Sequence, residues 1–212
     1  MPLVPAEWNV VVNGHWNRGI LTPSGISHRL FQLPPNTALQ IEVPLDAIGP
    51  YRVLYDNVVV MAGSNQLIVE ASICDMGTLE KALVVAHRAV QDLPETPVTA
   101  AGYNIRYQGQ STDPGLQPLL AALESAVDLR LAETSASVQG RGLVRTLAWE
   151  GGKINLGLGW DAPEILKVQF NFERIGTREE MMAWLQRPIG QVKEKVRSLV
   201  LNVLGLPREM LP

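Results

Sequence analysis

The sequence predicts an α+β protein with a largely antiparallel sheet, or sheets, and helices packed on one face. Two periods carry this prediction. Several segments alternate apolar and polar residues with the two-residue period of a strand that buries one face. Other segments repeat apolar residues every three to four positions, as amphipathic helices do. Sheets with one wet face are normally antiparallel, so the alternation favours that arrangement.

The predicted strands follow the alternation. It is clearest over 166–173, where apolar and polar residues take strict turns. The same period indicates strands over 39–45 and 66–74, and an apolar run predicts a further strand over 52–61.

Turn residues separate neighbouring strands. The Gly-Ser-Asn segment 63–65 predicts a hairpin with a short loop. Gly151-Gly152 lies between 142–150 and 153–160 at the spacing of a two-residue hairpin, because Gly tolerates the positive φ that primed turns need. Together with the strand that follows, these segments predict a three-stranded meander.

Two helices are expected in the middle of the chain. An apolar stripe predicts a helix over 79–92, with Thr78 as its N-cap and Pro94 after its end. Asp113-Pro114 predicts a second helix, since it resembles a cap followed by proline in the first turn.

A helical pair is expected at the C-terminal end. Thr177 and Glu180 have the spacing of a capping box, in which each side chain bonds to the other's backbone N–H. Pro188 predicts a break, and an aliphatic stripe predicts a second helix over 189–204 that stops at Gly205.

The predicted elements run as about three strands, a helix and a strand, and then a helix, three or four strands and the helical pair. Each half runs strands and then a helix, which suggests a pseudo-repeat at the level of topology. Without a low-complexity linker, residues 1–212 are expected to form a single compact domain. Its sub-halves would be 1–110 and 111–212, with 108–114 as the boundary.

Composition limits the classes of function. The net charge is −3, whereas a domain that neutralises many phosphates is usually basic, so nucleic-acid binding is disfavoured. Cys74 is the only cysteine, which excludes an intramolecular disulfide and Cys-based zinc sites. The N-terminal residues lack a signal-peptide pattern, and no apolar run reaches the roughly 20 residues of a membrane span. A cytoplasmic protein without membrane contact is expected.

No catalytic, cofactor-binding or metal-binding residue is predicted. His28 has serines nearby, but no G-x-S-x-G elbow accompanies them. The three histidines show no metal-ligand spacing. Gly157-Leu158-Gly159 lacks the following helix of a dinucleotide-binding turn. Cys74 lies beside Asp75, which disfavours a reactive thiolate.

One segment resembles a known family. Residues 93–107 read Leu-Pro-Glu-Thr-Pro-Val-Thr-Ala-Ala-Gly-Tyr-Asn-Ile-Arg-Tyr, follow a predicted helix and predict a strand. This segment resembles one in a sporadically distributed, uncharacterised bacterial family, and the resemblance covers about residues 30–110. It implies a bacterial or phage origin and contributes no site residues. Within the strand, Gly102 indicates close backbone approach, or a binding groove beside it.

Six residues are candidate contacts to a partner or ligand. Five tryptophans are many for this length, and tryptophan is favoured at interfaces and ligand pockets as well as in ordinary cores. Residues typical of turns are frequent in the segment 8–31, so a hairpin arm or an ordered loop is expected there. Binding residues concentrate in such loops. The candidates are Trp8, Trp16, His28, Gly102, Trp149 and Trp160.

The first interpretation of function is a non-enzymatic interaction or assembly module that binds another protein or itself. The alternative is a small apolar-ligand-binding domain with a pocket between sheet and helix. The residues expected to line that pocket are Trp149, Trp160, Phe170 and Phe172. A second alternative is an enzyme with dispersed catalytic residues, which requires His28 or His87 to lie beside a carboxylate or nucleophile in a cleft.

Overall fold

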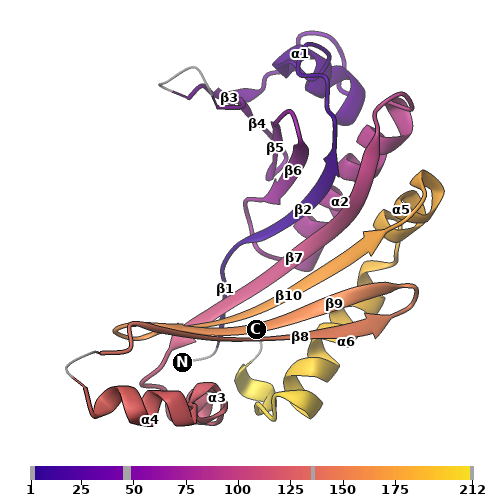
Figure 1. The fold of residues 1–212 in the computed structure, drawn as a ribbon. Helices are drawn as coiled ribbons and strands as arrows, with labels where there is room; N and C mark the ends of the chain where they lie inside the picture. Colours follow the sequence, from indigo (N-terminus) through magenta and orange to yellow (C-terminus); the bar gives the residue numbers. More distant parts are fainter. Residues whose placement is uncertain (1–2, 45–48, 135–136, 211–212) are drawn as a thin grey trace.

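The computed structural model describes residues 3–44, 49–134 and 137–210. Over these residues one ten-stranded sheet, in which every pairing is antiparallel, is combined with helices. The predicted α+β class and antiparallel sheet are therefore confirmed. Figure 1 shows a strongly curved sheet, with the helices beside β2, β7, β10 and β9 lying on one face.

The strands run in the order β3-β4-β5-β6-β2-β7-β10-β9-β8, with β1 beside β7. Their bounds are β1 (Val4–Pro5), β2 (Trp8–Gly14), β3 (Gln40–Glu42), β4 (Arg52–Tyr55), β5 (Val58–Ala62), β6 (Gln66–Ala71), β7 (Val98–Gln110), β8 (Gly140–Trp149), β9 (Gly152–Asp161) and β10 (Ile165–Ile175).

The helices and helical turns alternate with the strands along the chain. Their bounds are α1 (Pro23–Gly25), η1 (Ile26–Leu30), α2 (Met76–Asp92), η2 (Pro114–Leu116), α3 (Gln117–Leu123), α4 (Ala126–Ala132), α5 (Arg178–Leu185), α6 (Ile189–Ser198), η3 (Leu199–Val203) and η4 (Arg208–Met210).

β7 connects the two halves of the chain, because it pairs with β2 on one side and with β10 on the other. Over residues 166–173 of β10 the predicted alternation holds, and the apolar residues face the core while the polar residues face away. The core lies between this face and the helices, with α2 and α5 packed against each other and against the sheet.

The N-terminal segment differs from the expected arm. β2 is an interior strand between β6 and β7, and Trp8, Val10 and Val12 are at most 3% exposed. Its β-branched valines suit a position paired on both sides. The turn signals belong instead mostly to the residues after β2, where α1 and η1 form and η1 packs against α2.

Turns account for further differences. The expected strand 52–61 is two strands, because Asp56 and Asn57 take φ of 47° and 64° and form a tight hairpin turn between β4 and β5. In the β8–β9 hairpin the turn residues are Glu150 and Gly151, with φ of 45° and 80°, one position earlier than predicted. The strand expected over 39–45 is short, and its last residue lies outside the described residues.

α2 begins three residues before the predicted helix. Its N-cap is Asp75, and the Asp75 carboxylate accepts a hydrogen bond from the Thr78 backbone N–H at 2.7 Å. Thr78, predicted as the cap, is instead in the first turn. Aspartate is at least as good an N-cap as threonine, which accounts for the earlier start.

The predicted C-terminal signals are confirmed. Thr177 and Glu180 form a capping box at the start of α5, and Pro188 separates α5 from α6. α6 continues into the π-helical turn η3, after which Gly205 takes a φ of 65°. Asp113 likewise caps η2, with Pro114 in its first turn.

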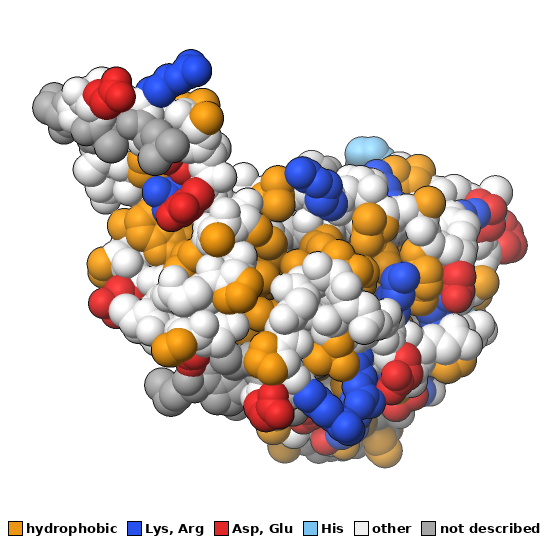
Figure 2. Space-filling model, turned by 90° about the horizontal axis from the view of Figure 1, so that it is seen from below, with side chains coloured by type: hydrophobic (Ala, Val, Ile, Leu, Met, Phe, Trp, Pro, Cys, Tyr) orange, Lys and Arg blue, Asp and Glu red, His pale blue; other side chains and the backbone are white. Residues whose placement is uncertain are grey.

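The helix-bearing side has an apolar middle. Figure 2, a view from below, shows hydrophobic side chains gathered across this face, with charged side chains around them. Half-buried apolar residues that pack against the core come from β8, α3, α6 and the residue after η3. They are Leu120, Leu143, Leu147, Ile189 and Leu204.

Candidate functional site

A pocket of about 450 Å³ lies on the helix-bearing side, where the first strands meet α2 and α6. Strand residues from β1, β2 and β7 form one wall, and the start of α2 and one face of α6 form the others. Its volume falls within the range of about 300–1,000 Å³ typical of small-molecule sites. The lining residues are Pro5, Trp8, Cys74, Asp75, Met76, Tyr107, Lys193, Val196, Arg197 and Arg208.

Two aromatic side chains form the strand wall of the pocket. The rings of Trp8 and Tyr107 make an edge-to-face contact, with centroids 5.7 Å apart and an interplanar angle of 75°. The indole of Trp8 is held in place because its Nε1–H donates to the Arg106 carbonyl at 2.9 Å. The same carbonyl accepts the backbone N–H of Ala6, also at 2.9 Å. Contacts among the strands themselves therefore hold this wall of the pocket in place.

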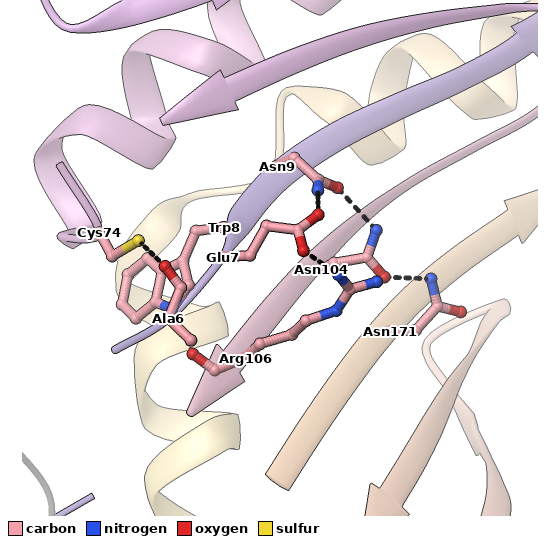
Figure 3. A network of polar contacts seen from close by, with 8 residues as sticks. All are labelled: Ala6, Glu7, Trp8, Asn9, Cys74, Asn104, Arg106 and Asn171. Atoms are coloured by element: carbon pink, nitrogen blue, oxygen red, sulfur yellow. Dashed lines mark hydrogen bonds and ion pairs between the residues drawn. The ribbon is translucent and has the colours of Figure 1, made fainter. Parts of the chain in front are cut away.

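Cys74 contributes a thiol that is already engaged. Its Sγ donates to the carbonyl of Ala6 at 2.5 Å, as Figure 3 shows. Burial is the largest cause that raises the pKa of this thiol; a backbone hydrogen bond at Trp8 lowers the pKa in part, and the carboxylates of Glu70, Glu7 and Asp75 raise it by smaller amounts. Cys74 is therefore a protonated, structural cysteine at neutral pH.

Tyr107 brings an unused donor to the pocket. Its side chain is 4% exposed, and no residue of the described chain hydrogen-bonds its hydroxyl. Burial, followed by the nearby Cys74, raises the pKa of the phenol, so the hydroxyl keeps its proton at neutral pH. A bound acceptor oxygen is the kind of partner that this hydroxyl lacks.

Three cationic side chains lie on the α6 side of the pocket. Lys193 and Arg197 are four residues apart on this helix and hence on the same face, with the buried Val196 between them. Arg208 of η4 adds a third positive charge. Asp75, the one carboxylate among the described lining residues, accepts hydrogen bonds from the backbone N–H and the hydroxyl of Thr78.

The opposite face of the sheet carries a ladder of asparagines. Asn9, Asn104, Asn171 and Asn155 occupy one row across β2, β7, β10 and β9. The amide N–H groups donate toward β2: Asn155 donates to Asn171 at 2.9 Å, Asn171 to Asn104 at 2.9 Å, and Asn104 to Asn9 at 2.7 Å. We call these four residues the asparagine ladder; its outer ends are Thr146, which donates to Asn155, and Glu7, which accepts from Asn9.

The strand start at residues 6–9 connects the pocket to the ladder. Figure 3 shows Ala6 and Trp8 on the side of Cys74, and Glu7 and Asn9 on the side of the ladder. Glu7 also pairs with Arg106. Because successive side chains of a strand point to opposite faces, four consecutive residues serve both sites.

Three of the predicted contact residues lie near the N-terminal half of the sheet. Trp8 lines the pocket. Trp16 is 4% exposed and donates to the Val12 carbonyl at 3.0 Å, which is a core position. Gly102 is buried, and a Cβ there would lie 2.3 Å from the Phe172 carbonyl oxygen, so close packing requires the glycine.

The other aromatic candidates lie in the second half of the core, away from the pocket. Trp149 contacts Phe172 and Trp184, and Arg187 lies 4.5 Å over its ring. Arg141 lies 5.1 Å over the ring of Trp160. The expected lining by Trp149, Trp160, Phe170 and Phe172 does not match this pocket, because Phe170 and Phe172 are fully buried in the core.

The histidines do not meet the condition set for a catalytic role. His28 is exposed on η1 and makes no side-chain hydrogen bond within the described residues. His87 is 8% exposed, and its Nε2 has no partner within the same residues. Burial lowers the pKa of His87, which favours a neutral imidazole in the core.

Most of the pocket was not predicted from the sequence. Lys193 and Arg197 lie in the helix predicted over 189–204, and Tyr107 ends the strand segment 93–107, but none of the three was a candidate contact residue. The asparagine ladder did leave a signal in part, because Asn155 and Asn171 occupy polar positions within alternating segments. Only the strand order places those positions in one row.

A search of protein-family models and of curated protein sequences finds no match to this chain. The resemblance over about residues 30–110 therefore stays an expectation. Of the helices in residues 3–44, 49–134 and 137–210, none is long and apolar enough to span a membrane. Within those same ranges, no three His, Cys, Asp or Glu side chains are grouped as metal ligands would be.

Proposed function

We propose that this protein binds a small molecule with an apolar body in the pocket between the sheet and helices α2 and α6. The observation that carries the proposal is the pocket itself, about 450 Å³ in volume, with Trp8, Tyr107, Met76 and Val196 in its walls. Fixed aromatic and aliphatic walls with a few polar groups are typical of small-molecule sites. Apolar contact supplies the affinity, and the hydroxyl of Tyr107 orients the ligand.

Filling the pocket with a side chain tests this proposal. Met76 is half-buried at the first position of α2 and lines the pocket, so Met76→Trp places an indole where the ligand would lie. We expect the full-length protein to bind the neutral dye N-phenyl-1-naphthylamine or its anionic relative 8-anilinonaphthalene-1-sulfonate at one site. Met76→Trp should weaken this binding about tenfold or more, measured by fluorescence titration.

Met182→Trp is the matched control, because Met182 is also half-buried against the core but lies on α5, outside the pocket lining. This variant should bind the dyes like the wild type. Equal binding by wild type and Met76→Trp would contradict the proposal, and so would the absence of binding by both dyes.

The second candidate function is self-association through the edge strand β8. β8 is ten residues long and ends the sheet, and its Val144 is 62% exposed. A long edge strand presents a row of unpaired backbone N–H and C=O groups with which another chain can pair. The molar mass in solution tests this candidate: a species at twice 23.2 kDa supports it, and a monomer at micromolar concentration contradicts it.

A further inference from the structure

The charges around the pocket restrict what it would bind. Among the described residues that line the pocket, three are cationic (Lys193, Arg197 and Arg208) and one is a carboxylate (Asp75), although the whole chain carries a net charge of −3. Positive charge is therefore concentrated here against the overall balance of the protein. A ligand with a negative group would neutralise it.

These cations are weakly paired within the protein. Lys193 and Arg208 form no ion pair with any described residue, and Arg197 reaches Glu194 only at 3.8 Å. Glu194 itself is 70% exposed at its side chain, and such a surface pair contributes little. The guanidinium groups thus keep their donors for a ligand, in a geometry suited to carboxylate or phosphate.

The carboxylate of Asp75 does not cancel this effect. It accepts two hydrogen bonds from Thr78 and caps α2, so it is turned toward the helix backbone. The seventeen-residue α2 starts at the pocket, and its positive end adds to the charge of the three side chains.

The apolar walls and the charged side define an amphipathic occupant. Trp8, Met76 and Val196 offer apolar contact next to the cations of α6. Tyr107 is 4% exposed and lines the same space, and its hydroxyl has no partner among the described residues. A hydrophobic body with an anionic head would satisfy both parts of the lining.

Building on the proposed function, we infer that the ligand is an amphipathic anion, a carboxylate or phosphate monoester on an apolar chain or ring. Its negative group is bound by Lys193, Arg197 and Arg208, and its apolar body lies against Trp8, Met76 and Val196.

Ligands that differ only in their head group test this inference. We expect the full-length protein to bind decanoate or decyl phosphate about tenfold or more tightly than decanol, measured by isothermal titration calorimetry below the micellar concentrations. Tighter binding of decanoate would identify a carboxylate, and tighter binding of decyl phosphate a phosphate. Raising the salt concentration from about 50 to 500 mM should weaken the binding of the two anions and leave the binding of decanol unchanged.

Charge-removing variants locate the head group. Arg197→Gln and Lys193→Gln should each weaken decanoate binding several-fold without changing the binding of decanol. Lys195→Gln is the control. This substitution removes the same charge from the same helix, but Lys195 lies outside the pocket lining. These exposed or half-exposed side chains are not part of the core, so folding should be retained.

The outcomes separate the inference from the proposed function. Binding of decanol as tight as that of the anions, with Met76→Trp blocking all of them, would overturn the anion inference and leave the proposed function intact. Equal effects of Arg197→Gln and Lys195→Gln would also overturn the inference. Failure of all three ligands to bind would overturn both.

Discussion

Tyr103 and Tyr107 point to the same face of β7, yet their hydroxyls have different surroundings. Tyr103 is fully buried, its ring stacks on Phe172 with centroids 4.8 Å apart, and its hydroxyl has no partner within the described residues. Tyr107 is nearly as buried, but its side chain lines the pocket. Burial raises the pKa of both phenols, so both remain protonated in the folded protein at neutral pH. The Tyr103 hydroxyl is thus a donor without a partner in the core, whereas Tyr107 belongs to the lining of the pocket.

Removing the hydroxyl of Tyr103 should therefore stabilise the protein. A buried donor without a partner costs about 1–3 kcal/mol, so Tyr103→Phe should raise the free energy of unfolding by about 1 kcal/mol. Urea denaturation at neutral pH measures it. Tyr107→Phe is the control and should change stability by less than about 0.5 kcal/mol. A loss of stability in Tyr103→Phe would show that the hydroxyl has a hydrogen-bond partner, such as an internal water.

At the scale of the elements, the asparagine ladder crosses four strands in register. Its central member, Asn104, donates to Asn9 and accepts from Asn171, and it is 8% exposed. Register matters here, because a shift of one residue between β7 and β10 would turn the amides of one strand to the other face. The ladder therefore fixes the alignment of β7, which also carries Tyr107 of the pocket.

Asn104→Ala should destabilise the protein by about 2 kcal/mol, because it leaves a buried acceptor on Asn9 and a donor on Asn171 without partners. The control is Thr146→Val at the exposed end of the row, which should cost less than about 0.5 kcal/mol. Urea denaturation again provides the measurement. Equal costs for the two variants would show that the ladder contributes no more than a surface contact.

At the scale of the whole molecule, the sheet has two unlike ends. β3 is a three-residue strand, whereas β8 presents ten residues at the other edge. Leu143 and Leu147 of β8 are only half-buried on the side of the helices, and Val144 is exposed on the other. A second copy paired along β8 would cover all three, so self-association would use this edge.

Val144→Lys should then convert a dimer at twice 23.2 kDa into a monomer, as measured by sedimentation equilibrium. A charged residue on an edge strand disfavours edge-to-edge pairing. Val203→Lys is the matched control, because Val203 is also 62% exposed but lies on η3. A dimer that survives Val144→Lys and not Val203→Lys would move the interface from β8 to the helix-bearing face.

Local signals predicted many of the elements. The alternation of β10, the capping box at Thr177 and the break at Pro188 act over a few residues, so they can be recognised in a single sequence. Two of the errors occurred where local signals competed. Asp75 replaced Thr78 as the cap of α2, and Asp56-Asn57 formed a turn inside an apolar run.

The sequence by itself determined the α+β class, most strand and helix segments and the confinement of the helices to the apolar face of the sheet, since periodicity and capping are local properties. Only the tertiary structure decided the strand order, in which β2 lies between β6 and β7. The pocket follows from that order, because Trp8, Tyr107 and Arg197 are far apart in the chain and meet only when β2, β7 and α6 pack together. Contacts of long sequence separation depend on the packing of all the elements, and no local pattern encodes them.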